Sequence, residues 1–222
     1  MPDTLPVITI DGPSGSGKGT VTQRVADRLG WRVLDSGALY RLVGFAVDQR
    51  AVGFEDESKI SEIAEHLNVE FNNGKIFLDG REVTDLIRTE GAGNNASRVA
   101  AMPGVRAALL DWQRGYAQPP GLVADGRDMG TVIFADAQLK IFLTASVEER
   151  ARRRHKQLIE KGQSANLDDL LRDIGDRDRR DRERSAAPLR AADDALVIDS
   201  TAVDVSSVVQ QILSLRERIA TG

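Results

Sequence analysis

A glycine-rich segment near the N-terminus carries the residues best suited to chemistry. It reads GPSGSGKGT from Gly12 to Thr20 and directly follows the apolar run 6–10. Its glycines permit a tight turn that directs successive backbone N–H groups inward. A helix beginning at Lys18 adds the positive end of its dipole and a flexible ammonium group at the same point. This pattern predicts that the segment, here called the phosphate loop, binds a nucleoside triphosphate.

The spacing departs in one place from the strict phosphate-loop pattern, which has Ser or Thr directly after the lysine. Gly19 takes that place and Thr20 follows, so the loop resembles the version found in nucleoside monophosphate kinases. We expect the Thr20 hydroxyl, and less strongly Ser16, on the Mg²⁺ side of ATP. The residues assigned to ATP in this loop are Gly12, Pro13, Ser14, Gly15, Ser16, Gly17, Lys18, Gly19 and Thr20.

Apolar runs separated by helical patterns predict how this loop is positioned. Buried parallel strands are typically continuous apolar runs. Five such runs lie at residues 6–10, 31–34, 121–124, 139–143 and 195–198. They predict a doubly wound α/β fold with a five-stranded parallel sheet. Polar clusters follow four of the runs, at 12–20, 35–37, 125–128 and 199–201, where ligands collect in such sheets.

The interval between about 36 and 115 is too long for a simple crossover. Helical patterns at 39–50 and 57–66 are followed by alternating apolar residues around Asn73-Gly74. This pattern predicts a β-hairpin, and Asp79-Gly80 predicts a second turn. We therefore expect an inserted subdomain that carries a small antiparallel sheet.

The polar clusters at the strand ends allow both structural and chemical roles. Ser36 either caps the helix that follows or contacts a ligand, and Arg41, one turn further on, could reach an acceptor phosphate. Asp125 ends an apolar strand and is a candidate for the hydrated Mg²⁺. Arg127 and Asp128 either belong to the site or form a surface pair in a plain turn.

Two segments are rich in arginine. Most charges between Asp168 and Arg184 fit a solvated helix with i,i+4 pairs, but Arg177, Asp181 and Arg184 have a spacing that places them on one face. That stripe could hold a ribose and a phosphate. The helix after the capping pattern 146–149 carries Arg150 and Arg154, and it is either a mobile cover over the triphosphate or an exposed basic face.

Composition limits the class of protein. The chain has 222 residues, a net charge of −4 and no cysteine, which excludes disulfides and thiolate catalysis and argues against a general nucleic-acid binder. No apolar run approaches the roughly 18 residues that span a bilayer. We expect one α/β domain with an insertion, soluble and cytoplasmic, with neither a nucleic-acid nor a membrane partner.

Five motifs taken together resemble the bacterial cytidylate kinases, and the resemblance extends from about residue 6 to residue 201. These motifs are GPSGSGKGT at 12–20, DSGALYR at 35–41, NASRVA at 95–100, ADGRDMGT at 124–131 and RDRRDR at 177–182. The resemblance implies transfer of the γ-phosphate of ATP, with Mg²⁺, to CMP or dCMP in pyrimidine nucleotide metabolism. It also implies a monomeric kinase domain with a core (1–36, 116–149, 166–222), a monophosphate-binding insertion (37–115) and a short lid (150–165).

Residue roles follow from the same resemblance. Arg41, Arg127 and Arg184 match the acceptor-phosphate contacts, Ser97, Arg106 and Asp128 match the residues that read cytosine, and Arg177 and Asp181 match those at the sugar. Arg150 and Arg154 resemble lid arginines that contact ATP. Ser36, Tyr40 and Asp125 are assigned to the CMP site as well, with Asp125 also touching Mg²⁺ through water and Thr20 directly or through water. Lys18, Arg127 and Arg184 are expected to act in catalysis.

Elementary chemistry agrees with these roles and also defines the alternatives. Asp128 can accept a hydrogen bond from the exocyclic amine of cytosine, whereas uracil presents a carbonyl there. The acceptor phosphate is already anionic, so no general base is required. A kinase for UMP, AMP or shikimate would share Lys18 without needing the cytosine-reading set. A GTPase switch is disfavoured because the chain lacks an Asn-Lys-x-Asp motif.

Overall fold

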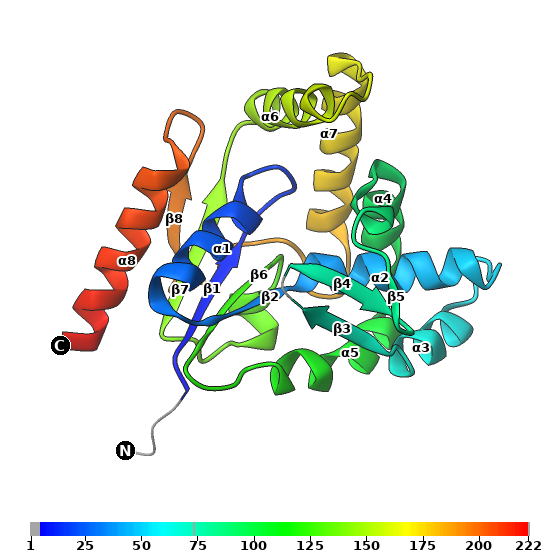
Figure 1. The fold of residues 1–222 in the computed structure, drawn as a ribbon, viewed down its shortest axis with the longest axis horizontal. Coiled ribbons are helices and arrows are strands. Elements are labelled where there is room, and N and C mark those ends of the chain that lie inside the picture. Colours follow the sequence, from blue (N-terminus) through cyan, green and yellow to red (C-terminus); the bar gives the residue numbers. More distant parts are fainter. Residues whose placement is uncertain (1–4, 73, 222) are drawn as a thin grey trace. The chain divides into compact units, whose positions relative to one another are not determined.

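The computed structural model describes residues 5–72 and 74–221, and it contains two compact units. The larger unit comprises Met1–Leu34 and Tyr116–Gly222, and the smaller unit comprises Asp35–Gly115. Figure 1 shows the elements of both. The larger unit contains β1 (Val7–Asp11), α1 (Lys18–Leu29), β2 (Arg32–Asp35, whose last residue is assigned to the smaller unit), β6 (Leu122–Gly126), η2 (Met129–Ile133), β7 (Leu139–Thr144), α6 (Val147–Glu160), α7 (Leu167–Glu183), β8 (Leu196–Asp199) and α8 (Val205–Thr221).

The larger unit is built on the five-stranded sheet that the sequence predicts. The strand order is β2-β6-β1-β7-β8, and β1 pairs in parallel with β6 and β7 on its two sides. The predicted fold class is confirmed. The third predicted strand is longer than expected, because β6 includes Asp125, which pairs in register with Ile10 of β1. Asp125 therefore lies within the strand rather than after it.

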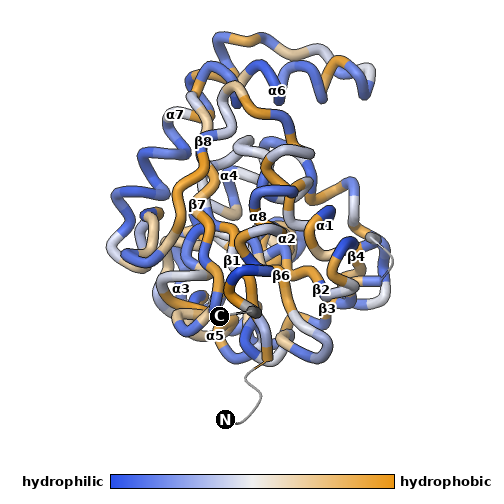
Figure 2. Tube along the Cα trace, turned by 90° about the vertical axis from the view of Figure 1, so that its left-hand side faces the viewer, coloured by the Kyte–Doolittle hydropathy of each residue, from blue (hydrophilic) through white to orange (hydrophobic). Residues whose placement is uncertain are grey.

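Helices α1 and α8 cover one face of this sheet because their apolar residues recur at helical spacing. Val21 and Val25 of α1 and Val208 and Ile212 of α8 are buried in the same core as the side chains of β1 and β7. Figure 2 shows β1 and β7 coloured mainly as hydrophobic, whereas α7 is coloured mainly as hydrophilic. None of the helices formed by the described residues is long and apolar enough to cross a bilayer.

The smaller unit contains the helices and the small sheet expected within the insertion. Its elements are α2 (Ser36–Gln49), α3 (Glu57–Glu65), β3 (Val69–Asn72), β4 (Lys75–Leu78), β5 (Arg81–Glu82), η1 (Leu86–Arg88), α4 (Glu90–Val99) and α5 (Pro103–Gly115). Strands β3 and β4 pair antiparallel, as do β4 and β5, so the predicted β-hairpin and the second turn are confirmed. Asp79 and Gly80 adopt φ values of 51° and 77° in the second turn. Asn73 of the first turn lies outside the described residues.

Candidate active site

The phosphate loop connects β1 to α1, and its glycines occupy positions that other residues could not adopt without strain. Gly15 has φ of 77° and Gly17, the N-cap of α1, has φ of 94°. A Cβ on Gly12 would lie 2.0 Å from the main-chain oxygen of Leu143. The left-handed conformation and the close approach of β7 therefore require glycine here. Helix α1 begins at Lys18, as predicted.

Lys18 lines a cavity of about 390 Å³ beside the phosphate loop. Its side chain is buried, and its ammonium donates a hydrogen bond to the main-chain oxygen of Pro13 at 2.9 Å. Arg153, Arg154 and Lys156 of α6 line the same cavity. These four cationic side chains line one cavity at the N-terminus of α1, and this arrangement favours a strongly anionic ligand such as a triphosphate.

Arg150 has a different position from the one expected for a lid residue. It is 1% exposed and forms a double-hydrogen-bonded ion pair with Asp178 of α7, at 3.0 and 2.5 Å. The same guanidinium donates to the main-chain oxygens of Ser14, at 2.9 Å, and Ala145, at 3.0 Å. Arg150 therefore holds the phosphate loop against α6 and α7 in this structure, whereas Arg154 lines the cavity.

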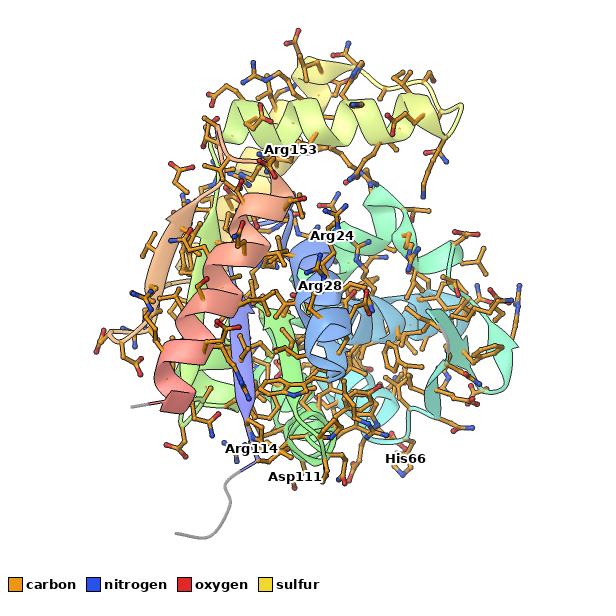
Figure 3. The ribbon with its side chains drawn as sticks, turned by 60° about the vertical axis from the view of Figure 1, so that its left-hand side comes forward. Arg24, Arg28, His66, Asp111, Arg114 and Arg153 are labelled. Atoms are coloured by element: carbon orange, nitrogen blue, oxygen red, sulfur yellow. The ribbon has the colours of Figure 1, made fainter. Side chains whose placement is uncertain are left out.

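A second connection holds the other half of the phosphate loop. Ser200 follows β8, and its hydroxyl proton is shared between the main-chain oxygens of Thr144, at 3.0 Å, and Ser16, at 3.2 Å. Arg153 donates to Ser200 Oγ at 3.2 Å and to the main-chain oxygen of Ser16 at 3.4 Å. Figure 3 labels Arg153, which belongs to α6. In a trans peptide the N–H points away from the C=O. Because these contacts hold the loop carbonyls on one side, the N–H groups of the same peptides point to the opposite side, where they can donate to a ligand.

The oxygen groups expected near Mg²⁺ lie beside the loop. Asp125 is buried, and its Oδ2 lies 3.9 Å from the position that a Cβ on Gly19 would occupy. Thr20 is exposed on the first turn of α1, and the buried Ser16 hydroxyl has no hydrogen-bond partner among the described residues. Carboxylate and hydroxyl oxygens are the hard ligands that Mg²⁺ prefers, so this set of donors fits the ion.

The predicted arginine–aspartate set of the larger unit is brought together, and Asp128, Asp181 and Arg184 are buried. Arg127 Nε donates to Asp181 Oδ2 at 2.9 Å, with side chains 15% and 3% exposed, and Arg184 Nη2 lies 3.9 Å from Asp128 Oδ1. The alternative of a surface Arg127–Asp128 pair is therefore wrong. Arg177 Nη1 donates to Ser14 Oγ at 3.3 Å. Helix α7 ends at Glu183, so Arg184 is its C-cap rather than part of a helical stripe.

Within the smaller unit, Ser36 is not the cap of α2. The N-cap is Asp35, whose carboxylate accepts from the Ala38 amide at 2.8 Å. Ser36 instead donates to Gln113 Oε1 at 2.8 Å, and both side chains are buried. This alternative fails because the helix already begins at Ser36, so the capping position falls on Asp35, one residue earlier.

The remaining predicted residues of the smaller unit lie on α2, α4 and α5. Arg106 lies with its guanidinium 5.8 Å from the ring of the buried Tyr40. Arg41 donates to the main-chain oxygens of Ile87, at 2.9 Å, and Thr89, at 3.0 Å. Ser97 of α4 is 5% exposed. The structure thus fixes the orientation of Arg41 through the turn η1.

Asp11 is a feature of this region that the sequence analysis did not identify. It ends β1, is 4% exposed and accepts hydrogen bonds from the Met129 and Gly130 amides, both at 2.8 Å. Burial is the main reason that the pKa of Asp11 rises from 3.8 to about 6, and the charge of Asp128 adds to it. The two amide hydrogen bonds and Lys18 act in the opposite direction. The signal was available, because Asp11, like Asp125, is an acid at the end of an apolar run.

We expect Asp11 to make the stability of the protein depend on pH. Below pH 3.8 the carboxyl is protonated in both states; as pH rises to about 6, the folded protein holds the proton more strongly than the unfolded chain. Stability is therefore lost over this window, by about 3 kcal/mol in total for a pKa difference of this size. Urea unfolding of the wild type and of Asp11→Asn between pH 4 and 7 measures the effect. Parallel stability profiles of the two proteins would contradict it.

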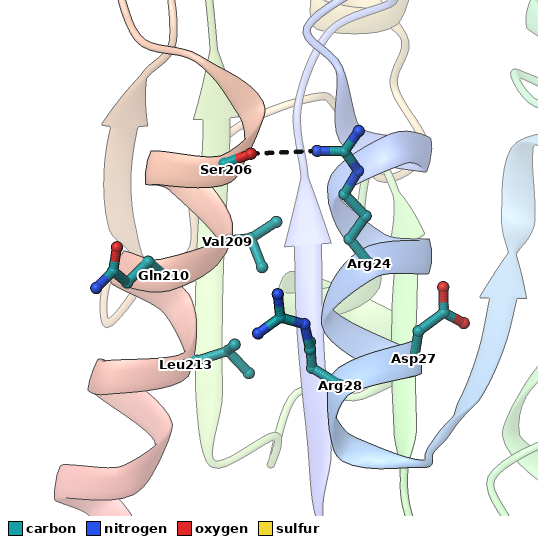
Figure 4. A pocket seen from close by; sticks show the side chains of 7 residues that line it. All are labelled: Arg24, Asp27, Arg28, Ser206, Val209, Gln210 and Leu213. Carbon is teal, nitrogen blue, oxygen red and sulfur yellow. Dashed lines mark hydrogen bonds between the residues drawn. The ribbon is translucent and has the colours of Figure 1, made fainter.

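A second cavity, of about 560 Å³, lies between α1 and α8 (Figure 4). Arg24 and Arg28 line it together with Val209 and Leu213, and Arg24 Nη1 donates to Ser206 Oγ at 3.4 Å. It lies one to three turns along α1 from Lys18, and none of the residues predicted to bind nucleotide lines it. The nucleotide assignment therefore stays with the cavity at the phosphate loop.

Comparison with known proteins adds family information to this geometry. A family model described as cytidylate kinase matches residues 8–218. The chain is 59% identical to a cytidylate kinase of Bordetella bronchiseptica, over 94% of this chain and 93% of that protein. It is 56% identical to the cytidylate kinase of Methylococcus capsulatus, over 97% and 98% of the two chains. It is also 53% identical to that of Pseudomonas aeruginosa, over 98% of each.

Solved structures support the fold at much lower identity. An uncharacterized protein from Eubacterium ventriosum aligns with a TM-score of 0.54 and 15% identity, covering 95% of this chain and 97% of that one. A gluconokinase from Sinorhizobium meliloti aligns with a TM-score of 0.50 and 14% identity, covering 98% and 94%. At such identities the likeness shows a shared fold.

Proposed function

Because the chain belongs to the cytidylate kinase family, we propose that it transfers the γ-phosphate of ATP to CMP and dCMP, forming ADP and CDP or dCDP. The observation that carries this proposal is the family match across residues 8–218, together with a glycine-rich phosphate loop that contains a buried lysine. An assay of purified protein with ATP and Mg²⁺ against CMP, dCMP, UMP and AMP tests it. Turnover that favours UMP or AMP over CMP would contradict it.

The ATP phosphates are assigned to the phosphate loop and to Lys18. Arg150 keeps the loop in shape through the Ser14 carbonyl, and Arg154 supplies a cation from the cavity wall. Transfer of a phosphoryl group spreads negative charge over its oxygens, so the preorganised cations lower the barrier by electrostatic stabilisation. Mg²⁺, when bound with ATP, neutralises phosphate charge; Thr20 and Asp125, the latter through water, are the residues that would hold it.

The acceptor nucleotide is assigned to the residues that the family resemblance singles out. Arg127 and Arg184, like Arg41 of the smaller unit, are proposed for its phosphate, and Arg177 and Asp181 for its sugar. Ser97 and Arg106 are proposed to donate to the cytosine acceptors, with Tyr40 and Ser36 beside them. Segment 37–115 is proposed as the monophosphate-binding subdomain and 150–165 as a short lid. Excluding water on closure would prevent hydrolysis of ATP.

Asp128 is proposed to determine the preference for cytosine. Its carboxylate is 3% exposed, so a uracil carbonyl placed against it would leave a buried charged acceptor unmatched. We expect Asp128→Ala to lower the CMP:UMP ratio of kcat/KM by about 10-fold or more, while KM for ATP changes little. A coupled ADP assay with both acceptors measures the ratio. A ratio that stays at the wild-type value would exclude Asp128 from base recognition.

The remaining properties are proposed on the family and the composition. The enzyme is a cytoplasmic monomer whose partners are ATP and CMP or dCMP, without a nucleic-acid or membrane partner. Sedimentation analysis at micromolar concentration tests the monomer.

A further inference from the structure

Asp128 lies at a position in the chain where an aspartate side chain normally caps the turn that follows. It is the N-cap of the short turn η2, and an aspartate at an N-cap normally accepts hydrogen bonds from the first amides of the turn. Asp128 makes no such capping bond. Its buried carboxylate lies instead 3.9 Å from the guanidinium of Arg184. Some other group must satisfy the first amides of η2, because buried unpaired N–H groups are costly.

Asp11, the last residue of β1, caps η2 instead of Asp128. Each of its carboxylate oxygens accepts from one of the two consecutive amides that open η2, Met129 and Gly130, at 2.8 Å. The contact joins residues 118 and 119 positions apart in the chain. Asp11 itself is fixed in the sheet, since its main chain pairs with Gly126 of β6 and Phe142 of β7.

Close packing prevents the turn from adjusting in another direction. A Cβ on Gly130 would lie 2.8 Å from Thr9 Oγ1 and 3.2 Å from Lys140 Cδ. A Cβ on Gly126 would lie 2.9 Å from Met129 Cγ. The main chain on both sides of Asp128 is therefore closely packed. The two hydrogen bonds that Asp11 accepts fix the first residues of η2, which directly follow Asp128.

We propose that Asp11 is a positioning residue for base selectivity: it caps η2 in place of Asp128 and so fixes the main chain from which the Asp128 carboxylate is presented to the acceptor base. This inference rests on the proposed function, and it assigns a role to a residue that makes no contact with the cytosine. It accounts for a buried acid whose ionised form is disfavoured by burial and by the charge of Asp128, while the two amide hydrogen bonds and the charge of Lys18 on α1 act against them.

Asp11→Asn is the sharpest test, because it keeps the shape of the side chain. One carboxylate oxygen becomes an NH₂ group, which would face a main-chain N–H, so one of the two bonds is lost and the turn must shift. We expect the CMP:UMP ratio of kcat/KM to fall about 10-fold, as for a lost polar match at the base, with KM for CMP rising and KM for ATP changing less than about twofold. Asp173→Asn, an exposed aspartate of α7, is the matched control and is expected to leave the ratio unchanged.

A double-variant cycle shows whether Asp11 acts through Asp128. In the Asp128→Ala background, the further change Asp11→Asn is expected to leave the CMP:UMP ratio unchanged, because the carboxylate that it positions is already gone. An effect on the ratio as large as in the wild type would overturn the proposal. So would an Asp11→Asn protein that keeps wild-type selectivity. If the wild type does not phosphorylate CMP at all, the proposed function fails first, and the two failures are thereby distinguished.

Two further measurements cover the case that Asp11→Asn does not fold. Asp11→Ser retains one acceptor and is expected to show the same selective loss for CMP. In the wild type, protonation of Asp11 places an O–H against one of the same amides, so the CMP:UMP ratio is expected to fall between pH 7.5 and pH 5.5. Ionisation of the acceptor phosphate is common to both substrates and cancels in this ratio. A ratio independent of pH across this range contradicts the proposal.

Discussion

Replacing Lys18 with methionine is expected to lower kcat for CMP phosphorylation by about 1,000-fold, the scale on which single charge-stabilising groups act in active sites. Methionine preserves the length of the side chain and removes the cation. Lys18 is 6% exposed and lines the cavity at the phosphate loop, and its burial lowers the local dielectric and strengthens its interaction with phosphate. Steady-state measurement of ADP formation at saturating ATP and CMP gives the change in kcat.

The cavity offers a matched control for this change. Lys156 lines the same cavity but has a side chain that is 78% exposed and lies 3.8 Å from Glu160. Solvent screens a cation in that position, so Lys156→Met is expected to change kcat less than about threefold. Equal losses in the two variants would show that the general positive potential of the cavity, rather than the placed ammonium of Lys18, supports catalysis.

Replacing Arg150 with methionine is expected to lower the free energy of unfolding by about 3–5 kcal/mol, the usual cost of leaving one partner of a buried ion pair uncompensated. Asp178, with its side chain 4% exposed, would keep its charge without a cation. The carbonyl of Ser14 would lose its donor as well, which loosens the phosphate loop. Urea unfolding monitored by circular dichroism measures the loss.

Removing both charges separates the uncompensated carboxylate from the loss of packing. Arg150→Met combined with Asp178→Leu leaves no buried charge, so we expect the double variant to regain about half or more of the lost stability. Arg172→Met is the control, since Arg172 forms an exposed pair with Asp169 on α7 and such pairs contribute little. A double variant no more stable than Arg150→Met alone would show that the guanidinium acts through packing and the loop carbonyls instead.

Local chemistry explains why much of the architecture could be predicted. Continuous apolar runs predict buried strands, and the Asp79-Gly80 pair predicts a tight turn, because both signals depend only on neighbouring residues. The phosphate loop belongs to the same class, since the backbone conformations at Gly15 and Gly17 require glycine in any context. The ends of the strands were predicted less accurately than their existence, since β6 extends to Gly126 and includes Asp125.

Pairing among charged residues could not be predicted in this way. The chain has 30 basic and 34 acidic side chains, and the segment 168–184 offers many equivalent partners at helical spacing. Burial selects among them: Asp178 and Asp181 of α7 are buried, whereas Asp173 and Asp176 are exposed. Only packed neighbours decide which face of an amphipathic, charge-rich helix turns inward.

The sequence by itself determined the parallel sheet and the place of the phosphate loop, because these follow from apolar periodicity and glycine positions. It also indicated the family, through the resemblance of five motifs to those of known kinases. Only the tertiary structure decided how the loop is held: Ser200 bonds to Ser16 across 184 positions, and Arg150 reaches Ser14 across 136. The tertiary structure likewise decided the role of Asp11, which accepts a hydrogen bond from the Met129 amide 118 positions away. Hydrogen bonds between residues so distant depend on how strands and helices pack, and no local pattern of residues encodes that packing.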